Sequence, residues 1–247
     1  MTRIAAFFIS LLILLIWWGL STIYPPFILP SPPVVLARAA DVLHSGLLIR
    51  HFLVTAGEAL SGFFIGVLAA LPLGYLMAKK PWLEKASAPF ISASQAIPIM
   101  ALAPLLIIWF GFGPASKVLV AALVTFFPVL TNIIVGLHSS EPRAYELMAV
   151  LGASKWQIFK KLEVPAALPV VFAGLRVGLA LSVTGAIVGE FTSSDRGLGY
   201  LVNMAAGMMD TPLMFVALFS LAILGLLFYA ALDLVRRILL PWSIRKS

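Results

Sequence analysis

The fold class of this chain is decided by one stretch, PAALPVVFAGLRVGLALSVTGAIVGEF, residues 165–191. Its only charged side chains are Arg176 and, near its end, Glu190. A hydrocarbon core about 30 Å thick needs about 20 apolar residues in a helix, and this stretch is long enough to supply them. The sequence therefore predicts a transmembrane helix here.

The composition of the whole chain agrees with a membrane protein. Of the 247 residues, 62% are hydrophobic and 11% are charged, whereas globular proteins have about 45–50% and about 25%. The mean hydropathy is +1.06. Since a soluble domain could not hide this much apolar surface, a soluble enzyme and a disordered chain are both excluded.

Further apolar runs of spanning length occur along the chain, and each is bounded by Pro, Gly or paired charges, as helix ends are. We therefore expect an all-α polytopic membrane protein with about six transmembrane helices. The alternative for the first run is a cleaved signal peptide, but such a segment has a shorter apolar region of about 7–15 residues. The other expected spans are Ile4–Tyr24, His51–Ala78, Ala86–Phe110, Ser116–His138 and Pro212–Val235.

The charges predict how the chain is oriented. The net charge is +7, from 17 Lys and Arg against 10 Asp and Glu. In membrane proteins basic residues gather in cytoplasmic loops, and most of them fall on one side here if the N-terminus lies inside, including Lys79, Lys80, Arg236 and Arg237. We therefore expect a multi-pass protein with both termini in the cytoplasm. The basic excess then needs no nucleic-acid partner.

The chain shows no sign of catalytic or metal chemistry. It has no Cys and three scattered His, which excludes thiolate sites and argues against a metal centre. A G-x-x-x-x-G-K-[ST] loop is absent, so ATP hydrolysis would belong to another chain. We expect no cofactor and no catalytic residue in this chain.

Two connections are long. The outer segment, 25–50, begins with several prolines and then shows helical spacing from Val34 to Leu48, which predicts a short helix in the membrane interface or a docking surface. The chain thus divides into a first transmembrane helix, an external loop, a core that includes the cytoplasmic loop 139–164, and a cytoplasmic tail. These four parts are residues 1–24, 25–50, 51–240 and 241–247.

The loop 139–164 is predicted to hold two short amphipathic helices that meet at Gly152. The first starts after Glu141-Pro142, and the second ends where Pro165 and Pro169 lead into the next span. Its apolar stripes either meet a partner or rest on the protein's own spans or on lipid headgroups. The pattern alone leaves both interpretations open.

This loop resembles a known motif. Glu146-Leu-Met-Ala-Val-Leu-Gly152, followed after nine residues by Leu162-Glu-Val-Pro165, resembles the EAA loop of binding-protein-dependent ABC importer permeases, with Leu147 and Met148 in place of two alanines. Other segments resemble the nitrate/sulfonate/taurine branch, which includes thiamine-pyrimidine and riboflavin permeases. These segments are Leu29–Pro32, Ala103–Lys117, Gly174–Arg176, Gly189–Phe191 and Gly197–Tyr200.

The resemblance implies an importer of the bacterial inner membrane. Two permease copies form the pore, cytoplasmic ATPase subunits carrying ATP and Mg²⁺ dock on the EAA loops, and an external binding protein delivers a small solute. The solute is a pyrimidine- or riboflavin-type precursor, or a sulfonate- or nitrate-type anion. The residues expected to couple the permease to the ATPase are Glu146, Ala149, Gly152, Ala153, Trp156 and Pro165.

Two other functions fit a polytopic chain. A secondary transporter would be expected to show repeated halves and several intramembrane ionisable groups. The second alternative is a membrane subunit that transports nothing. Copurification of an ATPase, and transport driven by ATP rather than by an ion gradient, would separate these alternatives from the importer.

Polar residues within the spans are candidates for the solute pathway or a gate. A bend at Ile97-Pro98 would free backbone groups to line a cavity. Arg176 either gates or pairs with Glu163, and Glu190 either closes the outer mouth or is a solvated helix end. Several glycines, including Gly66, Gly74, Gly174, Gly178 and Gly185, are expected to allow close helix packing. The pathway candidates are Gln95, Pro98, Asn132, Arg176, Ser182, Thr184 and Glu190.

Overall fold

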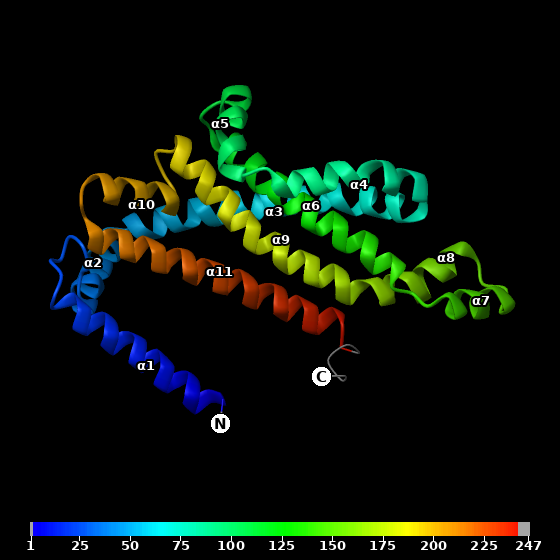
Figure 1. Ribbon diagram of the computed structural model, residues 1–247, viewed down its shortest axis with the longest axis horizontal. Coiled ribbons are helices and arrows are strands. Elements are labelled where there is room, and N and C mark those ends of the chain that lie inside the picture. Colours follow the sequence, from blue (N-terminus) through cyan, green and yellow to red (C-terminus); the bar gives the residue numbers. More distant parts are fainter. Residues whose placement is uncertain (1, 242–247) are drawn as a thin grey trace.

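The computed structural model describes residues 2–241, and within this range every regular element is a helix (Figure 1). The predicted tail at 242–247 lies outside the described residues. The elements are α1 Thr2–Ser21, α2 Pro32–His44, α3 Leu47–Lys79, α4 Pro81–Ala96, α5 Ile99–Phe110, α6 Pro114–His138, α7 Pro142–Val150, α8 Lys155–Ile158, the π-helical turn η1 Phe159–Glu163, α9 Val164–Ser193, α10 Leu198–Gly207 and α11 Thr211–Leu239.

Four of the described helices are long and apolar enough to cross a membrane: α3, α6, the continuous helix formed by α8, η1 and α9, and α11. They confirm the expected second, fourth, fifth and sixth spans. The first and third expected spans contain shorter apolar helices, at Phe7–Ser21 and Met100–Phe110.

The third expected span is not one helix. The chain leaves the helical conformation at Ile97 and Pro98, whose ψ angles are 121° and 123°, and α5 turns away from α4 (Figure 1). Proline disfavours the helical conformation in the residue before it and has no N–H to continue the ladder. The prediction of a single helix from Ala86 to Phe110 is therefore wrong.

The centre of the bundle is α6, which packs against α3 and α9 through glycines on those helices. A Cβ at Gly66 would lie 2.7 Å from the carbonyl oxygen of Ala122, and one at Gly185 would lie 2.8 Å from the Cα of Ala121. Both distances are too short for real side chains. The predicted packing role of the five glycines named above is confirmed, since each meets a neighbouring element at similar range.

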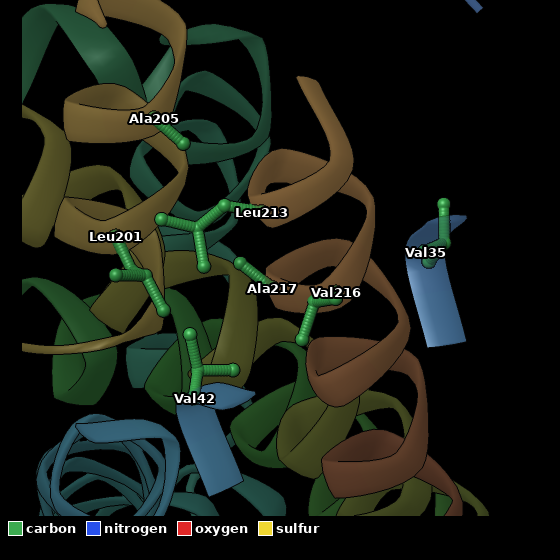
Figure 2. Close-up of a cluster of buried hydrophobic side chains, with 7 residues drawn as sticks. All are labelled: Val35, Val42, Leu201, Ala205, Leu213, Val216 and Ala217. Atoms are coloured by element: carbon green, nitrogen blue, oxygen red, sulfur yellow. The ribbon is translucent and has the colours of Figure 1, made fainter. Parts of the chain in front are cut away.

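A cluster of buried hydrophobic side chains joins α2, α10 and α11. Figure 2 shows Val35 and Val42 of α2 beside side chains from α10 and α11, all of them buried. The predicted helix at 34–48 is confirmed over most of its length, but it starts at Pro32 and ends at His44. It can start at Pro32 because a proline at the first position of a helix costs no hydrogen bond.

Two other boundaries differ from the prediction. The span after α2 begins at Leu47 rather than His51. The short helix α10 was not predicted.

The loop 139–164 differs from the prediction in its second half. The first helix, α7, is present, and Gly152 takes a left-handed φ of +66°. From Lys155 onward, however, one helix runs through Pro165 and Pro169 as far as Thr192. It widens into a π turn just before Pro165, whose missing N–H cannot bond to the preceding turn. The second predicted short helix is thus the base of a spanning helix.

Candidate functional site

The elbow formed by residues 142–158 projects beyond the ends of the spanning helices (Figure 1). None of the α7 side chains is buried. Apolar side chains are nevertheless prominent on it, with Val150 86% exposed, Leu151 70% and Trp156 67%. The interpretation that the elbow rests on the protein's own spans is therefore wrong.

The angle of the elbow is fixed by local hydrogen bonds. The N–H of Ala153 donates to the carbonyl of Met148 at 2.9 Å, closing the end of α7 around Gly152. The next helix begins with a capping box, in which the N–H of Ser154 donates to the side chain of Gln157 at 2.7 Å and the N–H of Gln157 donates back at 3.3 Å. The two arms are thus joined without a flexible linker.

The base of the elbow is tied to a second span through Glu163. This side chain is buried and forms a salt bridge with Lys79, at the end of α3. The same carboxylate oxygen accepts a hydrogen bond from the hydroxyl of Tyr145 in α7 at 3.2 Å. Burial, and then the negative charge of Glu163, raise the pKa of Tyr145, so its hydroxyl stays protonated and can donate.

Aromatic rings continue this contact along the helix. The ring of Trp156 stacks on that of Phe159 with centroids 5.4 Å apart, and Phe159 meets the edge of Tyr75 of α3 at 5.4 Å. The elbow is therefore in contact with both α3 and α9.

The predicted coupling residues lie where they can meet a partner, with one exception. Glu146, Ala149, Gly152 and Trp156 are exposed, and Ala153 is half-buried. Pro165 is half-buried within the continuous helix, so it does not end a short helix as expected.

Arg176 does not pair with Glu163. Its guanidinium donates to Asp233 of α11 at 3.2 Å and lies 4.5 Å from the centre of the Tyr229 ring. The predicted partner was wrong because the sequence does not show which helix lies beside α9 at this depth.

The break between α4 and α5 borders a cavity of about 630 Å³. Its lining is mostly apolar, and its polar side chains are Ser94, Thr131 and Asn132. The amide of Asn132 donates to the carbonyl of Pro128 at 2.8 Å. Gln95 lies in the last turn of α4, but its side chain is outside the described part of the chain.

The two hydroxyl candidates in α9 lie apart from this cavity. Ser182 is fully buried and donates to the carbonyl of Leu179 in its own helix at 2.8 Å. Thr184 is exposed and lies 3.4 Å from the carbonyl of Ala180. Both therefore bond to their own helix, as serine and threonine in helices often do.

Glu190 is not a solvated helix end. It is 1% exposed and accepts hydrogen bonds from the hydroxyl of Thr55 at 2.6 Å and from the N–H of Gly199 at 2.5 Å. The chain after α9 folds back over this carboxylate. The two glycines of Gly197-Leu-Gly199 were the sequence signal for this close approach of the chain to Glu190. A Cβ at Gly199 would lie 2.8 Å from the carboxylate.

Further polar contacts around Glu190 escaped the sequence analysis. Thr55 also accepts from the N–H of Leu198 at 2.7 Å, and the ring of His51 bonds the backbone of Gly197 at 2.9 Å. Lys117 is buried 3.7 Å from Glu58. These contacts join α3, α6, α9 and α10 at the end of the bundle opposite the elbow (Figure 1).

Two exposed residues stand beside this cluster. Asp195 accepts from the guanidinium of Arg196 at 3.0 and 3.1 Å. These hydrogen bonds lower the pKa of the Asp195 carboxyl, which keeps it ionised. Both residues line a cavity of about 970 Å³ together with Glu58, Lys117 and Glu190.

A bundle of glycine-packed spanning helices, a helix broken inside the apolar region and an exposed elbow rooted in two spans together define a membrane transport subunit of the permease class. Residues 62–245 match the family described as the binding-protein-dependent transport system inner membrane component, and the chain belongs to this family. The predicted relationship to ABC importer permeases is thereby confirmed, which argues against a secondary transporter and a non-transporting subunit.

Relatives of known annotation cover nearly the whole chain. A riboflavin transport system permease protein, RibX of Chloroflexus aurantiacus, is 49% identical over 95% of this chain and 89% of its own length. A formylaminopyrimidine transport permease protein, ThiX of Halalkalibacterium halodurans, is 38% identical over 94% and 93%. A taurine transport system permease protein, TauC of Escherichia coli, is 29% identical over 93% and 86%.

A solved structure shares the fold. The inward-facing MetNI methionine ABC transporter aligns with a TM-score of 0.68 at 20% identity, over 79% of this chain and 97% of that one.

Proposed function

We propose that this chain is the pore-forming subunit of an importer in the bacterial inner membrane, powered by ATP and Mg²⁺ on separate cytoplasmic ATPase subunits. A solute-binding protein delivers the solute from outside. The chain itself carries no catalytic residue and no cofactor. Membership of the permease family supports the role in transport. The exposed elbow is the observation that supports coupling to an ATPase.

The elbow is the proposed ATPase contact. Its exposed apolar side chains, Val150, Leu151 and Trp156, stand on a rigid turn. An exposed apolar surface of this kind in a membrane protein suits a protein partner, because burial of each such side chain contributes about 1.5–3 kcal/mol. A movement of the ATPase that displaces the elbow then reaches α3 and α9 through the contacts of Glu163 and Phe159.

The orientation follows from the same contact. An elbow that meets a cytoplasmic ATPase must face the cytoplasm, and this agrees with the basic residues gathered at that side. Both termini then lie in the cytoplasm. A second copy of the chain would complete the pore, because the cavity beside Asn132 is open in the single chain.

The proposed solute is an uncharged or weakly charged heterocycle of the pyrimidine or riboflavin type. No Lys or Arg lines the cavity at the α4–α5 break among the described residues, while an amide and hydroxyls do. A sulfonate or nitrate would lose its hydration there without a cation to replace it. The names of the riboflavin and formylaminopyrimidine relatives agree with this choice.

Reconstitution tests the proposal. The chain is coexpressed with an ABC ATPase and a solute-binding protein from the same source and placed in proteoliposomes. We expect the ATPase to copurify, and uptake of radiolabelled riboflavin or a formylaminopyrimidine to need ATP inside the vesicles. Uptake driven by a proton gradient without the ATPase would refute the importer role. ATP-driven uptake of taurine alone would refute only the solute class.

A further inference from the structure

A groove between α9 and α11 is not used by the proposed coupling or pathway. It encloses about 490 Å³ and is lined by apolar side chains except at one end, where Arg176 and Tyr229 lie. Both helices span the membrane, and they lie side by side in Figure 1. The walls include Leu226, which is 68% exposed. A trough of this kind matches the chemistry of an acyl chain.

The end of the groove carries an excess of positive charge. Asp233 is the only acidic residue of α11, and three arginines gather around it: Arg237 at 2.8 Å, Arg176 at 3.2 Å and Arg236 at 4.0 Å. One carboxylate cannot neutralise three guanidinium groups, so two positive charges remain. This excess of positive charge is suited to an anionic group.

The arginines have hydrogen-bond donors to spare. A guanidinium has five N–H donors, whereas a carboxylate has two oxygens. In the part of the chain described, Arg176 donates to Asp233 alone. The side chains of Arg176 and Arg236 are about one-third exposed, at 36% and 35%, so an anion can reach them.

The position along the helices agrees with a lipid headgroup. Arg236 and Arg237 belong to the last turn of α11, and Asp233 lies two turns or less before the helix ends, which is roughly 9 Å at 1.5 Å per residue. This is the depth at which a helix leaves the hydrocarbon core for the headgroup layer. The charged end and the apolar trough are continuous, so one amphipathic molecule can occupy both.

We propose that this groove binds one anionic phospholipid, with its phosphate on Arg176 and Arg236 and an acyl chain along α9 and α11 as far as Gly225. Basic pockets between transmembrane helices bind anionic headgroups by the same chemistry. Asp233 positions Arg176 and Arg236, and the Tyr229 ring under Arg176 holds its guanidinium plane. The lipid would contact both helices. This inference does not depend on the proposed solute or ATPase.

The test uses the full chain in mixed detergent and lipid, with bound lipids counted by native mass spectrometry. Dioleoyl-phosphatidylglycerol and dioleoyl-phosphatidylcholine are offered at equal concentration. We expect phosphatidylglycerol to be retained about tenfold in preference, and the double variant Arg176→Gln/Arg236→Gln to lose the preference. Arg50→Gln, which removes an exposed arginine at the start of α3, is the matched control and should retain it.

A second pair of variants tests the apolar part without touching a charge. A Cβ at Gly225 would meet no atom within 4 Å, so this position has room for a side chain. Gly225→Leu should fill the trough and abolish retention of either lipid at this site, whereas Gly225→Ala should preserve it.

Three results would overturn the proposal. One is equal retention of the two lipids by the unmodified chain. Another is undiminished phosphatidylglycerol preference in the double arginine variant. The third is a Gly225→Leu chain that keeps its lipid; if that chain also no longer self-associates, the groove is an interface between copies of the chain.

Discussion

Glu163, at the base of the long helix through α9, forms a salt bridge with Lys79 at the end of α3, and the hydroxyl of Tyr145 in α7 bonds the same carboxylate oxygen at 3.2 Å. Three elements therefore meet at one buried acid. The side chain of Glu163 is 4% exposed, while that of Lys79 is 41% exposed. Replacing Glu163 therefore leaves no buried charge, because Lys79 can reach water, whereas replacing Lys79 would leave the buried carboxylate without its ion-pair partner.

Glu163→Gln should loosen the link between the elbow and α3. The amide keeps the shape and one acceptor but loses the ion pair, and Lys79 can reach water. We expect a loss of about 1–3 kcal/mol in the free energy of unfolding, seen as a lower Tm of the purified chain. In the reconstituted importer, ATP hydrolysis should persist while uptake per ATP falls.

Glu84→Gln is the control for this change. Glu84 is half-buried and lies 3.9 Å from the half-exposed His138 without touching the elbow, so its replacement should alter neither measurement. Normal uptake per ATP in Glu163→Gln would show that the elbow reaches the spans by another route.

Gly152→Ala should disturb the angle of the elbow. The residue has a φ of +66°, and a Cβ there would meet no atom within 4 Å. The cost is therefore backbone strain alone, of about 1–2 kcal/mol. We expect the chain to insert normally but to support much less ATP-driven uptake. Gly152→Asp should also reduce uptake, but because it places a negative charge in the proposed partner surface rather than because of its φ angle.

Gly152→Asn separates conformation from side-chain volume. Asparagine tolerates the left-handed region far better than alanine, although its side chain is larger. Uptake should be largely retained in this variant. If Asn and Ala impair uptake equally, bulk at the partner surface rather than φ governs the position.

Val150→Glu should weaken the proposed ATPase contact without affecting the fold. The side chain is 86% exposed, so the thermal stability of the isolated chain should stay unchanged. A charge in a buried apolar interface is costly, and we expect the copurified ATPase to fall about tenfold. Glu146→Lys is an independent probe on the same helix. An unchanged yield of ATPase with Val150→Glu would place the contact elsewhere.

Thr55→Val should destabilise the end of the bundle where α3, α9 and α10 meet. It removes a hydroxyl that donates to Glu190 at 2.6 Å and accepts from the N–H of Leu198 at 2.7 Å. Two buried polar groups lose a partner at nearly constant volume, so we expect a loss of about 2–4 kcal/mol in the free energy of unfolding. Thr55→Ser keeps the hydroxyl and should cost much less. Equal melting temperatures for Val and Ser would contradict this reading of the contacts.

The spans could be predicted from the sequence because lipid imposes a long apolar run on each helix. The elbow could also be predicted, since Gly152 and the stripe before it are local signals. The continuity from Lys155 to Thr192 could not, because a proline normally ends a helix and the π turn that accommodates Pro165 has no sequence signature.

Side-chain contacts between different helices could not be predicted either. The pairing of Arg176 with Glu163 and the solvated position of Glu190 were each one of two alternatives left open, and both were wrong, because one sequence gives the depth of a residue along its own helix but not its neighbours. The true partners, Asp233 and Thr55, lie on other helices, far away in the chain. The glycine pair at 197 and 199 indicated close approach, without indicating what approached.

Asn132→Leu tests the proposed solute pathway. Asn132 lines the cavity at the α4–α5 break. Leucine has the same branched shape and the same number of heavy atoms but is larger, so the change removes the amide without opening a void. A heterocycle that exchanges one hydrogen bond with this amide should lose about tenfold in transport efficiency, the equivalent of about 1.4 kcal/mol. The measurement is the concentration dependence of ATP-driven uptake, with the effect expected in KM. Thr184→Val, exposed and outside the cavity lining, is the control. If both variants transport like the unmodified chain, the solute passes elsewhere, and the uncharged lining can no longer be used to argue for a heterocycle.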